Sequence, residues 1–370
     1  MEAVSVLVLG GYGHFGARIV RALSTTPQLH VIAAGRHPDA AKAVFSSEVL
    51  ARITLTRVEI QAPDLVAQLQ ATGAQLVVHT AGPFQGQGYE VALACLQADM
   101  HYIDLADGRD FVRDFAAQVD AAAHAAGRSA ISGASTLPAL SSAVVDALLP
   151  QFTALHEIAT VIAPAQATPL GMATVRAVLS YCGQPFRWWC DARWQATRGW
   201  ADPQPVAFAR LAPRLASPCD VPDHDLLVQR YPGVRRVQFR AALELPFLQR
   251  SLALIAGVRG LGVPLPMANL AQVFARAGRW FDRFGTELGG MLVELRGTRE
   301  GQAHALRWEL TAPMLHGPEI PCFAAVLLVR RFARGEPLPV GAHACVGLIS
   351  LAEFEQAFAD WQIETTVTPA

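Results

Sequence analysis

Leu9-Gly10-Gly11-Tyr12-Gly13-His14-Phe15-Gly16 is the most informative segment of this 370-residue sequence. It contains two overlapping glycine patterns, GxGxxG and GxxGxxG, directly after an apolar run at residues 4–9 that is typical of a buried strand. Residues 15–24 then have the apolar spacing of an amphipathic helix. Glycines at a strand-to-helix turn permit a sharp bend and bring backbone amides close to a diphosphate. The segment therefore predicts a dinucleotide-binding turn.

Short apolar runs and alanine-rich helical runs alternate around this turn, as far as about residue 135. Strict alternation of this kind predicts a parallel sheet with helices on both faces, so we expect a Rossmann doubly wound domain at residues 1–135. The expected strands are residues 4–9, 29–34, 53–60, 76–80, 102–105 and 129–131, and the expected helices are residues 15–24, 38–50, 63–71, 89–97 and 111–126.

The rhythm changes after residue 135, where the segments become longer and are interrupted by proline and tryptophan. We expect a second, α+β domain at residues 136–320, built on a mixed or antiparallel sheet. Its expected strands are residues 156–163, 174–181, 234–245, 291–298 and 303–312, with hairpins and loops at 184–225. Helices are expected at residues 140–149, 321–334 and 351–361.

The end of the second expected strand carries a signal for the type of nucleotide. The sequence there is Ala34-Gly35-Arg36-His37, whereas a site that prefers NAD usually has an acidic residue for the ribose hydroxyls. An arginine guanidinium instead matches the oxygens of a 2′-phosphate. We therefore predict that NADP(H) is favoured over NAD(H).

A third segment, Thr80-Ala81-Gly82-Pro83, ends the expected strand at residues 76–80. Small residues and a proline at the carboxyl end of a buried strand leave room for the nicotinamide half of the cofactor. The three segments together predict cofactor contacts from Gly10, Gly11, Tyr12, Gly13, His14, Phe15, Gly16, Gly35, Arg36, His37, Thr80, Ala81, Gly82 and Pro83.

Composition excludes several other functions. A net charge of −1 gives no general attraction to nucleic acid, and 52% hydrophobic against 16% charged residues indicates a globular chain. The six cysteines form no CxxC pair and no His/Cys cluster at zinc spacing, so we expect no metal site. Lys42 is the only lysine, and it lies in an alanine-rich stretch that gives no sign of a Schiff-base pocket.

Two features bear on location. No basic region precedes the first expected strand, so we expect no signal peptide and a cytoplasmic protein. The most apolar long segment, residues 243–274, is interrupted by Glu244, Arg250 and Arg259 and does not predict a spanning helix. Peripheral membrane contact through this segment stays open as an alternative.

The quoted motifs resemble the saccharopine dehydrogenase-like oxidoreductase family. The resemblance rests on GGYGHFG (10–16), GRHPDAA (35–41), TAGPF (80–84), HYIDLADGRDF (101–111) and SGASTLPALSSAVVD (132–146), and it continues at DVPDHDLL (220–227). It implies an NAD(P)-binding Rossmann domain, a second domain whose sheet forms a substrate or dimer surface, and C-terminal helices at residues 321–370 that pack back on the first domain. It also implies a homodimer. Residues 136–139 read Thr-Leu-Pro-Ala where members acting on saccharopine carry Asp-Pro-Gly, so we do not expect a role in lysine metabolism.

Hydride transfer to a carbonyl or imine also needs a proton donor near the acceptor atom. The candidates are Asp104 and Tyr102 at the end of an expected buried strand, and His316 in the turn that ends at Glu319. We therefore predict an NADP(H)-dependent oxidoreductase that acts on a small or lipid-like carbonyl, imine or enoyl substrate. The alternative is a non-catalytic NADP-binding regulator or scaffold, with or without peripheral membrane contact.

Overall fold

The computed structural model describes residues 3–168, 171–263 and 267–370, and the chain divides into two compact units. The first unit contains the chain up to Ala139 together with Glu319–Ile349. The second contains Leu140–Pro318 together with Ser350–Ala370. The segment 321–370, whose helices we expected to pack back on the first domain, is divided between the two units after residue 349.

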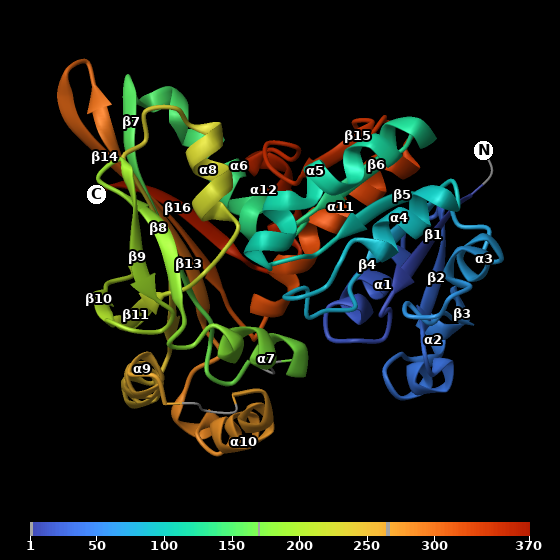
Figure 1. Ribbon diagram of the computed structural model, residues 1–370, viewed down its shortest axis with the longest axis horizontal. Helices are drawn as coiled ribbons and strands as arrows, with labels where there is room; N and C mark the ends of the chain where they lie inside the picture. Colours follow the sequence, from blue (N-terminus) through green and yellow to red (C-terminus); the bar gives the residue numbers. More distant parts are fainter. Residues whose placement is uncertain (1–2, 169–170, 264–266) are drawn as a thin grey trace. The chain divides into compact units, whose positions relative to one another are not determined.

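The first unit is built on a parallel sheet of seven strands in the order β15-β6-β5-β4-β1-β2-β3 (Figure 1). Every neighbouring pair runs parallel, which confirms the predicted Rossmann sheet. The strands are β1 (Val4–Leu9), β2 (Leu29–Gly35), β3 (Ile53–Arg57), β4 (Leu76–His79), β5 (His101–Asp104), β6 (Ser129–Ser132) and β15 (Gly341–Ala344).

The strand order determines where this sheet has a ligand-binding crevice. From β1 the chain moves outward to β2 and β3, and then returns to β4 on the other side of β1. Right-handed crossovers in opposite directions place the connecting helices on opposite faces of the sheet. They also leave a crevice at the carboxyl ends of β1 and β4, where open α/β sheets bind their ligands. The helices of this unit are α1 (Gly16–Ser24), α2 (Ser47–Leu50), α3 (Leu65–Gln70), α4 (Glu90–Gln97), α5 (Arg109–Ala126) and α11 (Ile320–Ala333).

One expected helix of the first unit is interrupted. Residues 38–50 form a 3-10 helix, Pro38–Ala43, and then the short α2. The interruption lies at Ser46, whose backbone is extended and whose side chain accepts a hydrogen bond from Val49 N, so that it caps α2. A serine in a helical pattern competes for backbone groups in this way.

The second unit is built on a mixed sheet of nine strands, as the sequence predicted. Its main path is β10-β11-β12-β7-β13-β14-β16, and β8 and β9 branch from β12. Only the β12–β7 pair is parallel among the described strand pairs of this sheet. The strands are β7 (Ala154–Ala163), β8 (Pro185–Cys190), β9 (Arg193–Arg198), β10 (Gln204–Val206), β11 (Arg214–Pro218), β12 (Arg236–Leu243), β13 (Gly289–Arg299), β14 (Gln302–Ala312) and β16 (Glu364–Pro369).

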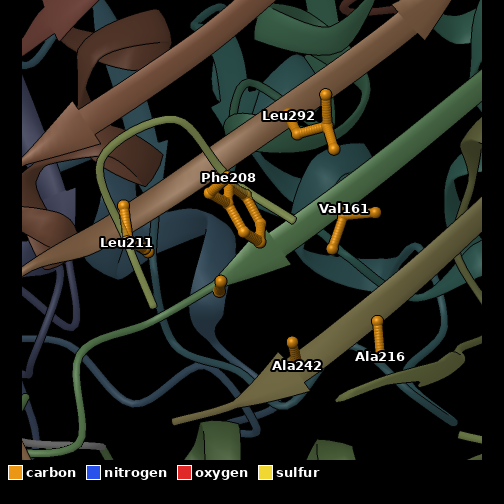
Figure 2. Packing of buried hydrophobic residues seen from close by; sticks show 7 residues of the cluster. Val161, Phe208, Leu211, Ala216, Ala242 and Leu292 are labelled. Carbon is orange, nitrogen blue, oxygen red and sulfur yellow. The ribbon is translucent and has the colours of Figure 1, made fainter. Parts of the chain in front are cut away.

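The two faces of this sheet are covered differently. On one face a loop carries Phe208 and Leu211 over Val161, Ala242 and Leu292, which come from three neighbouring strands (Figure 2). On the other face the sheet contacts helices of the same unit. The helices of this unit are α6 (Ser141–Leu148), α7 (Met172–Ser180), α8 (Asp223–Arg230), α9 (Pro246–Gly260), α10 (Met267–Arg279) and α12 (Leu351–Ala359).

The strand that we expected at residues 174–181 is wrong, because this segment is the helix α7. Apolar residues stand at every second position, 175, 177 and 179, and Thr174, Arg176 and Ser180 lie beside them, which is the pattern of a strand although Val178 interrupts it. Val175, Ala177 and Leu179 are nevertheless buried in the helix, where α10 packs against α7. Two further strands, β15 and β16, were not predicted at all.

Candidate cofactor site

Two glycines of the turn between β1 and α1 have no room for a side chain. Gly10 has a φ of +75°, and a Cβ there would lie 2.9 Å from Thr80 Oγ1. A Cβ at Gly16 would collide with the carbonyl oxygen of Gly10 and lie 2.7 Å from the same hydroxyl. The turn is therefore packed to the backbone, and only glycine fits at these two positions.

Several backbone amides of the turn form no hydrogen bond within the described part of the chain. Gly10 N and Gly11 N donate to Ala34 O, and Gly13 N donates to Gly10 O. In contrast, the amides of four residues donate no hydrogen bond to any described part of the chain: Tyr12, His14, Phe15 and Gly16. They lie at the start of α1, where the helix dipole also favours an anion. This cradle of free donors fits a diphosphate.

Thr80 ties the end of β4 to this turn. Its hydroxyl donates to Leu9 O at 2.8 Å and lies 3.2 Å from Gly10 O, while its amide donates to Leu9 O at 2.9 Å. The loop that follows is held by Gln87, whose Nε2 donates to Ala81 O and Pro83 O. The structure thus brings the predicted segment 80–83 to the glycine turn. Gln87 was not predicted, because nothing in its neighbouring sequence indicates which carbonyls it reaches.

Tyr12 connects the turn to the end of β2. Its hydroxyl accepts a hydrogen bond from His37 N at 2.9 Å, and its ring lies against Gly35, where a Cβ would overlap it. Arg36, between these two residues, is exposed and forms no ion pair or hydrogen bond with the described residues. Its positive charge is near enough to Tyr12 to act against the rise that burial causes in the pKa of that phenol. A free guanidinium therefore lies at the edge of the cradle.

The side chains at the start of α1 contribute little net positive charge. Burial and the neighbouring Arg18 lower the pKa of His14 to about 4, so His14 is neutral at pH 7. Arg18 Nε lies 2.8 Å from Glu319 Oε1, and this ion pair offsets the arginine's charge. Arg36 is consequently the cation of this region without a carboxylate partner among the described residues.

The two candidate proton donors at the end of β5 are deeply buried. Asp104 is 0% exposed, and its Oδ1 accepts hydrogen bonds from Ala106 N, Ser132 Oγ and Gly133 N. Burial raises the pKa of Asp104 to about 6, against the effect of these bonds. Tyr102 is 1% exposed, and its hydroxyl is 2.9 Å from His79 Nδ1. Asp104 thus organises the loop after β6.

The third candidate, His316, lies in the second unit. Its Nδ1 is 2.7 Å from Trp361 O, and its ring meets the Trp361 ring edge-on at 5.0 Å. The side chain is half-buried by these contacts. These contacts indicate that His316 has a structural role, in which it holds the segment that follows α12.

Comparison with known proteins agrees with this geometry. Residues 6–131 match the family model of the saccharopine dehydrogenase NADP binding domain. The chain is similar to apo saccharopine dehydrogenase (L-Glu forming) from Saccharomyces cerevisiae, at 11% identity and a TM-score of 0.68, over 99% of this chain and 100% of that one. It is also similar to an amine dehydrogenase from Mycobacterium smegmatis, at 10% identity and a TM-score of 0.51, over 94% and 95% of the two chains. At these identities the likeness concerns the fold. No curated protein sequence matches the chain.

Proposed function

We propose that this chain is an oxidoreductase that uses NADP(H) in preference to NAD(H), because residues 6–131 match the family model of the saccharopine dehydrogenase NADP binding domain. The observation that carries the proposal is the cradle of free amides at the start of α1, with the unpaired guanidinium of Arg36 beside it. The cofactor would supply the hydride. The substrate class is a small or lipid-like carbonyl, imine or enoyl compound.

Each part of the site has a separate task in this proposal. The amides of Tyr12, His14, Phe15 and Gly16 hold the diphosphate, and Thr80 keeps the loop at residues 80–83 against the turn. Arg36 binds the 2′-phosphate through charge-assisted hydrogen bonds. A carboxylate for the ribose hydroxyls, which an NAD site would need, is replaced here by this arginine.

Substitution of Arg36 tests the cofactor preference. A charge-assisted contact contributes roughly 1.5–3 kcal/mol, so we expect wild-type protein to bind NADPH about ten- to 150-fold more tightly than NADH. In Arg36→Asp this preference disappears, because the new carboxylate repels the 2′-phosphate. Arg52→Asp makes the same charge change at an exposed position directly before β3, at the opposite edge of the sheet from Arg36. We expect this variant to keep the preference for NADPH. Equal wild-type affinities for the two nucleotides, measured by titration calorimetry, would reject the assignment.

The burial of Asp104 and Tyr102 favours a second candidate function, an NADP-binding regulator without turnover. Neither side chain reaches the surface, so neither offers a proton to a bound substrate in this arrangement. The two functions differ in one measurement. An oxidoreductase consumes NADPH with at least one member of a panel of carbonyl, imine and enoyl compounds, whereas the regulator binds NADPH tightly and consumes none.

A further inference from the structure

Exposed apolar side chains are concentrated in one segment of the second unit. Twelve large hydrophobic residues are exposed in the described part of the chain, and eight of them lie between residues 247 and 284. The eight are Phe247, Leu254, Val258, Leu261, Val263, Val273, Trp280 and Phe284. Scattered surface apolar residues are ordinary, but such a concentration marks an interaction surface.

Helix α9 presents apolar side chains to the outside. Phe247, Leu254 and Val258 recur at spacings of seven and four residues, which places them on one side of the helix, and Leu261 follows at its C-cap. Leu254 is 71% exposed and Leu261 is 86% exposed. The opposite side, with Gln249, Leu252 and Ala256, is buried. The helix therefore carries apolar side chains both on the side that packs and on the side that faces outward.

Helix α10 and the short turn after it add aromatic residues of the same kind. Val273 lies on α10 and is 59% exposed, and Trp280, the first residue after this helix, is 76% exposed. Phe284 follows in the 3-10 turn Asp282–Phe284, with the guanidinium of Arg283 over its ring at 4.7 Å. Phe247 and Phe281 meet edge-on at 4.9 Å, which links α9 to this turn. Figure 1 shows α9 and α10 at the same end of the second unit.

The charges on this segment are almost all positive. Residues 246–284 contain five arginines and a single acidic residue, Asp282. Asp282 already accepts a hydrogen bond from Gln166 Nε2 at 3.1 Å. Four of the arginines are exposed: Arg250, Arg276, Arg279 and Arg283. The surface thus combines exposed aromatic and aliphatic groups with an unbalanced positive charge.

We propose that this surface, formed by α9, α10 and the turn after α10, docks on an anionic lipid membrane. An amphipathic element with Trp, Phe and Leu on one side and arginines beside them inserts its apolar groups at the headgroup boundary, while the arginines bind lipid phosphates. No helix among residues 3–168, 171–263 and 267–370 is long and apolar enough to cross a bilayer. A second copy of the chain fits less well, because a two-fold contact would bring the same arginines together without acidic partners.

Co-sedimentation with lipid vesicles tests the proposal. We expect the wild-type protein to bind phosphatidylglycerol/phosphatidylcholine vesicles, and to bind pure phosphatidylcholine vesicles more weakly. Leu254→Glu/Leu261→Glu replaces the two most exposed leucines of α9 and its C-cap with charged residues and lowers binding to the mixed vesicles at least about tenfold. Arg250→Gln/Arg276→Gln lowers it about 25-fold on anionic vesicles, since each arginine near such a surface contributes about fivefold. Val367→Glu, at a 47% exposed position on β16, is the matched control and keeps wild-type binding.

A second readout uses the wild-type protein and one conservative variant at an exposed position. Brominated phosphatidylcholine in the mixed vesicles quenches a tryptophan that reaches the headgroup boundary, so we expect quenching in the wild type and its loss in Trp280→Phe. Wild-type protein that stays in the supernatant with anionic vesicles would overturn the proposal. So would a wild-type dimer, observed by analytical ultracentrifugation, that dissociates in Leu254→Glu/Leu261→Glu, because a second copy would then cover the surface. Neither readout involves NADPH or turnover, so the proposal stands or fails independently of the proposed function.

Discussion

Asp223, at the start of α8, has an unusually unfavourable environment for a carboxylate. It is 2% exposed, and burial raises its pKa to about 7, although a hydrogen bond with Ser141 acts in the opposite direction. The same carboxyl group in an unfolded chain has a pKa of about 3.9. Between about pH 4 and 7 the folded protein therefore holds a proton that the unfolded chain has released. The contribution of Asp223 to stability falls as the pH rises through this window.

Asp223→Asn removes this dependence, because the amide stays neutral at every pH. From pH 5.5 to pH 8, the unfolding free energy of the variant should rise by about 2 kcal/mol relative to that of the wild type. The change arises over the roughly 1.5 pH units between pH 5.5 and the folded pKa, at about 1.4 kcal/mol per unit. Urea unfolding at the two pH values measures this gap. Asp360→Asn, at an exposed position after α12, is the control for which we expect a constant difference. A constant difference for Asp223→Asn as well would contradict the protonated state that we assign.

The residues that sequence reasoning located and those that it missed differ in one physical respect. The glycine turn and Arg36 follow from local chain geometry, since a strand, a tight turn and a helix occur in sequence order. Asp223 is different, because its burial depends on α6 and α8, which are separated by about 75 residues of chain. No pattern within the segment DVPDHDLL distinguishes a buried aspartate from a solvated one at a helix start.

At the scale of elements, strand prediction succeeded where the strand is long or central. β1 was predicted to the residue, and β12, β13 and β14 within about two residues at either end. β15 is only Gly341–Ala344, and its sequence, GAHA, has neither β-branched residues nor alternation. It is a strand because it pairs with β6 at the edge of an existing sheet. Pairing of that kind joins residues more than 200 positions apart and leaves no local signal.

The contact between β4 and the β1–α1 turn makes a testable link between elements. Thr80→Val keeps the shape of the side chain but removes the hydroxyl that donates to Leu9 O. We expect a loss of about 1 kcal/mol in unfolding free energy and weaker NADPH binding, because the turn loses a hydrogen bond that fixes it to β4. Thr80→Ser keeps the hydroxyl and restores most of both quantities. Thermal unfolding with and without NADPH measures them, and a valine variant that behaves like the wild type would remove the link.

At the scale of the whole molecule, the chain completes the first unit only on its return from the second. α11 contacts α1, and Arg330 Nη2 donates to Ala22 O at the end of that helix. β15 adds the seventh strand, and Ala342 N donates to Asp120 Oδ1 on α5. Glu319 supplies the carboxylate that pairs with Arg18 beside the cradle. The cofactor site is therefore supported by residues that are about 300 positions away in the sequence.

Two shortened chains test this dependence. A chain that ends at Pro318 lacks α11 and β15, so it exposes the edge of β6 and the face of α1 that α11 covers. We expect it to lose NADPH binding and to be digested rapidly by a low concentration of protease. A chain that ends at Ile349 keeps every element of the first unit and loses only α12 and β16 from the second. It should still bind NADPH, although its second unit is destabilised, and wild-type affinity in the shorter chain would show that the returning segment does not support the site.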